Sequence, residues 1–291
     1  MSAVKSLLVA ALGGALLAAP VAAQSHLRVS PAHPLPGAVV TLTLRDSGGG
    51  RDSIVAIRGT MAGEPLHFES ARGEHRAIGA VPVDSVASVV AQALVTRASG
   101  RVDTLRVAVE IPPLPPPSEQ LAVASRFGRP LDAATQARVA RENARALAVG
   151  RRSHQSPRVW SAPFLRPRAS EISSSFGTGR TFNGAVTSRH LGVDFRGAVG
   201  EPVRAANAGV VALVDRFFLG GRVVYIDHGA GVVTGYLHLS KVLVAVGDTV
   251  TRGQQIGLVG ATGRVTGPHL HWNARYGALT VNPLDLVALD W

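Results

Sequence analysis

The chain has 291 residues, enough for two domains, and 46% of them are hydrophobic, which excludes a chain that is disordered by composition. The formal net charge is +11, and no cysteine is present, which excludes disulfide scaffolds and cysteine-ligated metals. The positive charge favours an anionic polymer as partner. Nucleic-acid binding needs a basic patch interleaved with aromatic residues, but the arginines are spread along the whole chain. We therefore expect no nucleic-acid partner.

The N-terminal segment carries the pattern of a secretory signal peptide. Lys5 precedes an apolar run from Leu7 to Ala19, and small residues follow at the cleavage position. A membrane-spanning helix needs about 20 apolar residues, and this run is shorter and contains two glycines. We expect a signal peptide over residues 1–23, no transmembrane segment in the mature chain, and export to the periplasm or the extracellular space.

Residues 24–111 are predicted to form an immunoglobulin-like β-sandwich. Short segments of alternating or β-branched residues, such as AVVTLTLRD (38–46) and DTLRVAVEI (103–111), are separated by glycine-containing turns. Several short strands at this spacing are typical of a sandwich. The histidines of this region show no ligand-like spacing and are interpreted as surface residues: His26, His33, His67 and His75.

The chain continues with a proline-rich linker and a helix. IPPLPPPS (111–118) carries five prolines in eight residues, which indicates an extended linker. Residues 131–150 predict a helix that is capped by Asp132 and ended by Gly150. One face of this helix carries apolar residues at helical spacing: Ala133, Ala137, Ala140, Ala144 and Leu147. His154 lies in the loop that follows and is expected to be solvated.

The chain from Phe164 onward predicts an antiparallel β-domain, because glycine-bounded strand-like segments follow one another without a long helical pattern. The segment SRHLGVDFRG alternates between two faces, and its glycines disfavour a helix. One face is apolar, and the other carries His190 and Asp194. His228, beside Gly229 at the end of a strand, has no paired ligand and is interpreted as a turn residue.

Two further segments present histidines on strand faces. VTGYLHLS adds His238, which alternation places on the same face as Tyr236. TGPHLHWN has His269 and His271 on one face, with a leucine and a tryptophan opposite. Three strands thus offer four histidines and one aspartate, which predicts a metal site.

The predicted ligand types are compatible with several metals. Imidazole and carboxylate groups suit zinc, iron or copper. Two histidines and a carboxylate could form the facial triad of a non-haem iron oxygenase, but export is an unusual setting for ferrous iron chemistry. Three protein ligands with an open position are also the pattern of catalytic zinc. The two remaining histidines could then act as acid–base groups near a bound water.

The motifs HLGVD, YLH and GPHLH, in this order, resemble those of the lysostaphin-like (LytM-type) zinc metallo-endopeptidases, which are peptidoglycan hydrolases. The resemblance covers roughly residues 170–287. It implies one zinc ion (Zn2+) per chain, with these metal ligands: His190, Asp194 and His271. It assigns His238 and His269 to catalysis beside a metal-activated water, and it implies that the partners are the peptide stems of peptidoglycan. Asn273 stands where many members have glutamate, which we expect to change the surroundings of the metal without abolishing catalysis.

The predicted fold class is mostly β, with three regions after the signal peptide. These are an immunoglobulin-like β-sandwich (24–111), a Pro-rich linker with a short helix (112–163) and an antiparallel β-sheet metallopeptidase domain (164–291). The predicted function is hydrolysis of peptidoglycan cross-links by a secreted endopeptidase. The alternative is a non-catalytic relative that binds the cell wall or activates a partner amidase. All five site positions are filled, which favours an enzyme.

Two local motifs suggest other functions, which we discount. VGDTVTRGQQIGLVG resembles the hairpin of a biotinyl or lipoyl carrier, but no lysine lies at its turn. GATGRVTG (260–267) is glycine-rich like a phosphate loop, but no Lys-Ser/Thr follows and no βαβ unit surrounds it. We interpret it as a loop that leads into the strand with the HLH motif. The segment 177–189 is expected to shape the choice of substrate.

Overall fold

The computed structural model describes residues 25–46, 52–71, 73–84, 87–113 and 117–291. The predicted signal peptide over residues 1–23 lies outside these ranges. Strands dominate the chain, and the prediction of a mostly β fold is confirmed. Within the described ranges, none of the helices combines the length and the hydropathy that are needed to cross a membrane.

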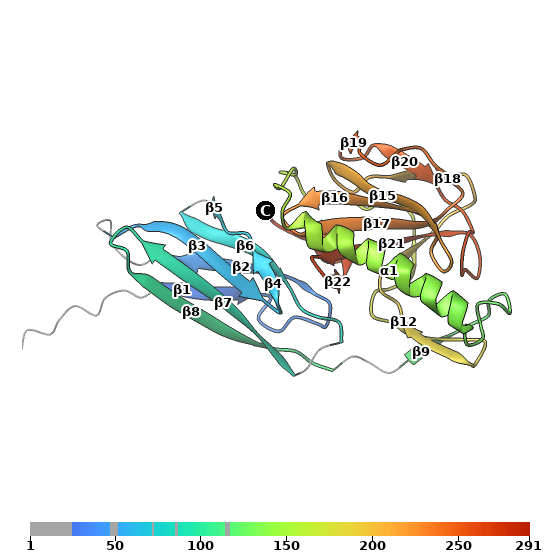
Figure 1. Ribbon diagram of the computed structural model, residues 1–291, viewed down its shortest axis with the longest axis horizontal. Coiled ribbons are helices and arrows are strands. Elements are labelled where there is room, and N and C mark those ends of the chain that lie inside the picture. Colours follow the sequence, from blue (N-terminus) through green and yellow to red (C-terminus); the bar gives the residue numbers. More distant parts are fainter. Residues whose placement is uncertain (1–24, 47–51, 72, 85–86, 114–116) are drawn as a thin grey trace, which may run out of the picture.

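Two four-stranded antiparallel sheets form the N-terminal part of the protein, on the left of Figure 1. In sheet order, the first contains β1 (His26–Ser30), β2 (Val39–Arg45), β6 (Glu74–Ala80) and β5 (Glu69–Ala71). The second contains β4 (Glu64–Leu66), β3 (Ile54–Met61), β7 (Ser88–Arg97) and β8 (Val102–Glu110). Apolar side chains of both sheets, such as Leu42 and Ala91, meet in one buried core. The arrangement is a β-sandwich, in which alternate residues of each strand face inward.

The segment after the prolines is more than a linker. Pro117–Leu121 forms strand β9, which pairs in parallel with β11 (Gly179–Phe182), and β11 pairs with β12 (Val186–Arg189). A proline is tolerated at the first position of a strand because its missing N–H is not needed there. The predicted linker therefore contributes a strand to a small sheet of the C-terminal part.

The predicted helix is present as α1 (Ala133–Ser153). The Asp132 carboxylate accepts the N-cap hydrogen bond from the Thr135 amide at 2.7 Å, as expected. The predicted end of the helix is wrong, because α1 continues through Gly150. A Cβ at Gly150 would lie 2.1 Å from the Gly277 carbonyl oxygen, so this glycine allows close packing and does not end the helix.

The buried face of α1 also differs from the prediction. Four of the five predicted face residues are exposed: Ala133, Ala137, Ala140 and Ala144. The face that packs on the sheet carries Glu142, Ala146 and Val149. The Glu142 carboxylate accepts a hydrogen bond from the Phe218 amide at 2.7 Å. Because alanine occurs all round this helix, the spacing of alanines could not identify the buried side.

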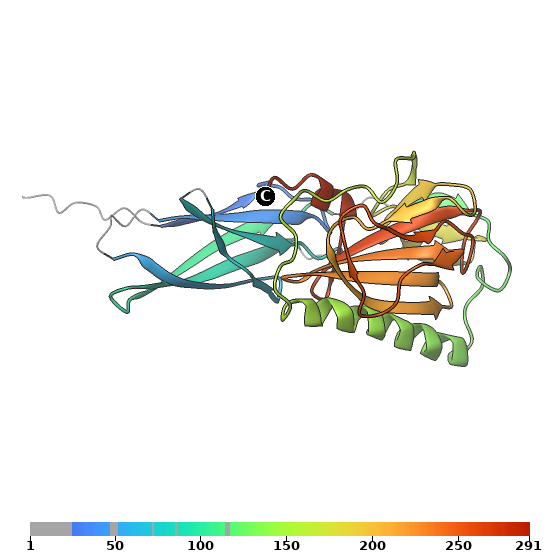
Figure 2. The ribbon, with the colours of Figure 1, turned by 90° about the horizontal axis from the view of Figure 1, so that it is seen from above.

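The C-terminal part is built on a large antiparallel sheet with α1 along one face (Figure 2). Its strand order is β10 (Ile172–Ser174), β13 (Val193–Arg196), β21 (His269–Tyr276), β17 (Val232–Leu239), β16 (Gly221–Gly229), β15 (Gly209–Phe217) and β19 (Thr249–Val250). The remaining elements are β22 (Leu279–Val281), which pairs with β21, and the short helix α2 (Pro283–Val287). A smaller sheet of β14 (Pro202–Arg204), β20 (Gln255–Leu258) and β18 (Lys241–Val242) packs on the other face.

The two faces of the large sheet carry separate apolar layers. The layer toward α1 contains these sheet residues: Phe217, Val223, Tyr225, Val233 and Leu237. Tyr236 and Trp272 belong to the layer on the other face. In the register of β17 and β21, Tyr236 lies opposite Trp272, and Leu237 lies opposite His271. Strand alternation therefore puts His271 on the face that α1 covers.

The sandwich contacts the C-terminal part through a polar cluster. His154, at the C-cap of α1, lies 2.8 Å from Glu64 through Nε2 and 2.9 Å from His67 through Nδ1. We call these three residues the interface cluster. Beside it, the Tyr276 hydroxyl donates to the Pro65 carbonyl at 2.6 Å. The predictions that His154 is solvated and that His67 lies on the surface are wrong, because packing between distant segments leaves His154 only 10% exposed and His67 half-buried.

Candidate metal centre

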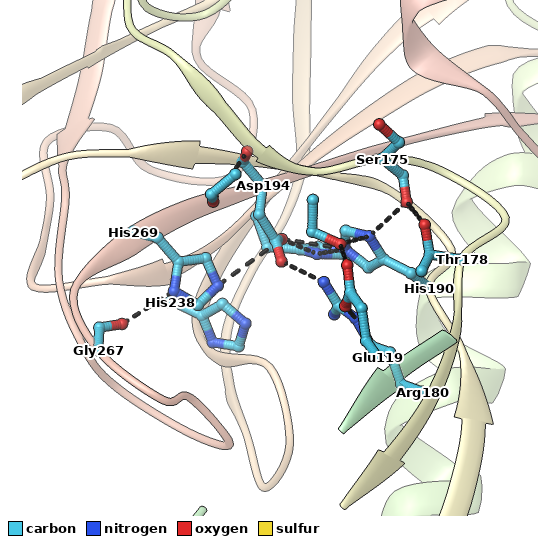
Figure 3. Close-up of polar contacts among 12 residues, drawn as sticks. Glu119, Ser175, Thr178, Arg180, His190, Asp194, His238, Gly267 and His269 are labelled. Carbon is cyan, nitrogen blue, oxygen red and sulfur yellow. Dashed lines mark hydrogen bonds and ion pairs between the residues drawn. The ribbon is translucent and has the colours of Figure 1, made fainter. Parts of the chain in front are cut away.

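Three of the predicted site residues bring a ligand atom to one point, as Figure 3 shows for His190 and Asp194. Asp194 in β13 lies directly opposite His271 in β21, and His190 lies just before β13. The His190 Nε2 atom is 3.0 Å from Asp194 Oδ1 and 3.0 Å from His271 Nδ1. The His271 Nδ1 atom is 2.8 Å from the same carboxylate oxygen. We call these residues the metal triad, since one ion can contact all three.

The backbone sets the orientation of His190. Its Nδ1 atom lies 2.8 Å from the Ser175 carbonyl oxygen, which can only accept, so Nδ1 donates its hydrogen and Nε2 keeps a lone pair toward the triad. Gly192, the central residue of HLGVD, lies close against His271. A Cβ at this position would be 2.6 Å from the His271 ring. The motif therefore needs a glycine here so that the imidazole can approach the loop.

Asp194 is held through both of its oxygens. While Oδ1 faces the two histidines, Oδ2 accepts a hydrogen bond from Arg180 at 2.6 Å, and Arg180 also donates to Glu119 at 2.8 Å (Figure 3). Burial opposes a charge on Asp194, but the close contacts with the His190 and His271 rings outweigh it and hold the pKa of this carboxyl well below its ordinary value. Burial lowers the pKa of His271 to about 4. The triad thus presents a carboxylate and a neutral imidazole, the forms that bind metal.

The other two predicted site residues, His238 and His269, lie side by side next to the triad (Figure 3). Their ring centroids are 4.8 Å apart, and His269 Nε2 is 3.7 Å from Asp194 Oδ1. His238 Nδ1 donates to the Thr262 carbonyl at 2.8 Å, and His269 Nδ1 donates to the Gly267 carbonyl at 2.9 Å. Burial, followed by the neighbouring imidazoles, lowers the pKa of His238 well below its ordinary value. Among the described residues, neither Nε2 atom has a hydrogen-bond partner, so both are available beside the triad.

The prediction that His238 shares a face with Tyr236 is wrong. Tyr236 is fully buried on the opposite face of the sheet, where its hydroxyl accepts a hydrogen bond from the Ala206 amide at 2.7 Å. His238 has a φ of 63°, in the left-handed region that residues other than glycine rarely adopt. This turn of the backbone breaks the alternation and brings the imidazole beside His269 and His271. Such backbone strain is typical of functional sites.

His228 is not a turn residue, contrary to the prediction. It lies in β16, is fully buried and uses both ring nitrogens. Nδ1 is 2.6 Å from the Ala208 carbonyl oxygen, and Nε2 is 2.8 Å from Thr234 Oγ1. Burial lowers its pKa to about 4. With both nitrogens engaged inside the core, His228 is a structural residue without a free ligand atom.

A cleft of about 650 Å³ opens beside the five predicted residues. Sequence reasoning did not identify the other charged residues that line it, which are Glu119, Arg180, Arg189, Arg196 and Arg264. Arg180 lies within the segment 177–189, which was expected to shape substrate choice. Glu119 comes from β9 and Arg264 from the loop before β21. Because these residues come from three segments far apart in the chain, no local motif could have indicated them together.

Comparisons with known proteins identify the family of this region. Residues 188–283 match the model of peptidase family M23. The peptidoglycan DD-endopeptidase ShyA of Vibrio cholerae is 46% identical over 116 residues, which are 39% of this chain and 26% of that protein. The chain therefore matches about a quarter of the length of this curated relative.

Two solved structures are similar to this protein. A candidate M23 peptidase from Pseudomonas aeruginosa is 29% identical with a TM-score of 0.65, and the match covers 87% of this chain and 95% of that one. The catalytic domain of lysostaphin from Staphylococcus simulans is 31% identical with a TM-score of 0.38, and the match covers 41% of this chain and 93% of that one. The resemblance seen in the sequence motifs is confirmed, and residues 188–283, which include all five predicted site residues, are a peptidase family M23 domain.

Proposed function

We propose that this protein is a zinc-dependent endopeptidase that hydrolyses the peptide cross-links of bacterial peptidoglycan. One zinc ion per chain is held by the metal triad, and the partners are the peptide stems of the cell wall. The M23 domain and the similarity to a relative named as a peptidoglycan DD-endopeptidase support the proposal. A substrate in the cell wall requires export, so the proposed location is the periplasm or the extracellular space, in keeping with the predicted signal peptide.

The observation that carries the proposal is the geometry of the three ligand atoms. Two nitrogens and one oxygen lie 2.8 to 3.0 Å from one another, so an ion at ~2.0–2.1 Å, the usual zinc–ligand distance, reaches all three. Imidazole and carboxylate are also ligand types that zinc prefers. Three protein ligands leave the fourth position of a tetrahedron for solvent or substrate, which is the pattern of a catalytic zinc site.

The side chains around the triad supply the remaining chemistry. Zinc bound there would lower the pKa of a bound water to ~7 and polarise a carbonyl as a Lewis acid. His238 and His269 hold their free Nε2 atoms next to this position, where they orient the water, transfer protons and stabilise charge on the substrate oxygen. The chain contains no H-E-x-x-H motif, so a histidine must take the role that glutamate has in helical zinc proteases.

Metal analysis of the purified chain, combined with digestion of isolated peptidoglycan, tests this proposal. We expect one zinc ion per chain and new amine termini as cross-linked peptides are cut. A chelator should stop hydrolysis, and added zinc should restore it. Full zinc occupancy without new amine termini would contradict the proposal and favour the alternative of a non-catalytic relative that binds the cell wall or activates an amidase.

A further inference from the structure

The cleft beside the metal triad carries more positive than negative side chains. Besides Asp194 and the histidines, its charged lining residues are Glu119, Arg180, Arg189, Arg196 and Arg264. Arg180 is compensated by Glu119 and Asp194, at 2.8 and 2.6 Å. Arg196 pairs with Glu171 at 3.1 Å, and Arg189 donates to the Gly177 carbonyl at 2.6 Å. These three arginines are therefore held by partners from the protein itself.

Arg264 differs from the other arginines of the cleft. Its guanidinium lies over the Phe182 ring, 4.1 Å from the centroid, and no acceptor among the described residues receives a hydrogen bond from it. An aromatic ring offers its face to a cation but leaves the N–H donors of the guanidinium edge available. Burial, followed by repulsion from Arg180, lowers the pKa of Arg264 to about 10, so the side chain is still charged at neutral pH. The cleft thus holds a positive charge without a counter-ion in the described part of the chain.

The loop that carries Arg264, GATGRVTG, is firmly packed. The Arg264 amide donates to the Leu219 carbonyl at 2.8 Å. Two residues earlier, the Thr262 hydroxyl donates to the Leu239 carbonyl at 3.0 Å and accepts from the Arg222 amide at 2.9 Å. A guanidinium on such a loop is already in place before a ligand arrives, so little conformational entropy is lost on binding.

We propose that Arg264 is a carboxylate-binding residue of this cleft, and that the preferred substrate is a peptide with a free carboxylate close to the scissile amide. The inference rests on the proposed peptidase function. A guanidinium presents a planar fork of N–H groups that matches the two oxygens of a carboxylate. A bound carboxylate supplies the missing counter-ion and offsets the repulsion between Arg264 and Arg180. Arg264 therefore acts on substrate choice and does not touch the reacting atoms.

Cross-linked stem-peptide dimers from peptidoglycan provide the test, in comparison with the same dimers after chemical amidation of their carboxylates. For the zinc-loaded wild type we expect kcat/KM to be about ten- to a hundred-fold higher on the untreated dimers, the range for hydrogen bonds to charged groups. Arg264→Gln should bring the ratio of kcat/KM on untreated to amidated dimers close to one. Arg264→Lys keeps the charge but loses the planar fork of N–H groups, so its ratio should lie between those of Arg264→Gln and wild type. Synthetic dimers amidated only at the C-terminus or only on a side chain identify the carboxylate that is bound.

Arg216→Gln is the matched control, because this exposed arginine of β15 lies outside the cleft lining and its loss changes the net charge equally. It should keep the wild-type ratio. Circular dichroism and thermal unfolding of each variant show whether its fold is intact.

Titration calorimetry with the cleaved peptides and their amidated forms measures the same preference without turnover. Wild type should bind the carboxylate form about ten-fold more tightly or better, and Arg264→Gln should bind both forms alike. Equal binding of the two forms by wild type, or a preference that survives in Arg264→Gln, would overturn the subsite and leave the peptidase proposal standing. Carboxylate binding that depends on Arg264, without any hydrolysis by the zinc-loaded chain, would contradict the peptidase proposal alone.

Discussion

The metal triad and the interface cluster contain the same kinds of side chain at similar distances, yet they differ in what they can bind. The triad atoms surround one point at mutual distances of 2.8 to 3.0 Å. The interface cluster is a line, in which His154 contacts His67 through one ring nitrogen and Glu64 through the other. Among the described residues, the triad is the one group of three such side chains whose ligand atoms converge. Close contacts between histidines and a carboxylate therefore do not by themselves indicate a metal site.

The difference lies in how the second ring nitrogen is used. Three site histidines donate Nδ1 to a backbone carbonyl: His190, His238 and His269. A carbonyl only accepts, so the tautomer is set and Nε2 is left available. His154 and His228 have both nitrogens engaged by neighbours. A histidine is available for metal binding or proton transfer where the main chain holds one nitrogen and the other faces a cleft.

The largest expected effect comes from His271→Ala, with His154→Ala as its matched control. Two remaining ligands should not retain zinc, so zinc content and peptidoglycan hydrolysis should both fall to background. His154→Ala removes an imidazole whose contacts are equally close, but this variant should keep its zinc content and its hydrolysis of peptidoglycan. It should lower the free energy of unfolding by about 1–3 kcal/mol, because Glu64 and His67 lose a buried partner. Elemental analysis, a digest and denaturant unfolding measure these outcomes, and zinc loss from His154→Ala would contradict the distinction between the two clusters.

His238→Ala and His269→Ala separate metal binding from turnover. Neither side chain belongs to the triad, so both variants should keep one zinc ion per chain. Hydrolysis should fall by about 10²- to 10⁴-fold, the range for loss of a general acid or base. Steady-state kinetics together with metal analysis of the same samples test this. A variant that also loses its zinc would show that the substituted histidine is a ligand.

Most of the site was predictable because strand geometry is local. Even spacing put both histidines of HLH on one face of β21, and the pairing of β13 with β21 sets Asp194 opposite His271. The prediction that His190 shares a strand face with Asp194 is wrong, because His190 lies in the turn between β12 and β13 and reaches the site from there. The same alternation misplaced His238, because its φ of 63° is imposed by surrounding packing and not by its own sequence neighbours. Glu119 was not predicted as a site residue, because the proline-rich segment before it does not indicate the pairing of β9 with β11.

The fold was predictable where patterning was strong. β-Branched alternation indicated the sandwich and the C-terminal sheet, and the Asp132 cap marked the start of α1. The buried face of α1 was not predictable, because an alanine-rich helix has little contrast between its sides. The burial of His154 depends on contacts with residues 87 and 90 positions away, which no local pattern encodes.

His228 offers a pH-dependent test of a histidine with both nitrogens engaged. Its pKa is about 4 in the folded chain against an ordinary 6.5, so between these values the unfolded chain binds more protons. Above pH 6.5 the neutral His228 ring makes its full contribution to the free energy of unfolding. This contribution, about 3 kcal/mol, is lost as the pH falls from 6.5 toward 4. His228→Gln should flatten this part of the stability profile, as measured by urea unfolding of the zinc-loaded chain at several pH values. An unchanged slope would mean that His228 does not stay neutral in the folded state.

Arg180→Gln should have the smallest effect on the site. Without Arg180, Asp194 Oδ2 loses its charged donor and the carboxylate is free to rotate away from the metal position. We expect zinc affinity to fall about 10- to 100-fold, as for other groups that orient metal ligands, measured by competition with a chelator. Arg158→Gln removes an arginine that donates to Glu69 at 2.8 Å at the contact with the sandwich, and it should leave zinc affinity unchanged. Equal affinity in both variants would mean that Arg180 only shapes the cleft, and that the backbone pairing of β13 with β21 alone positions Asp194.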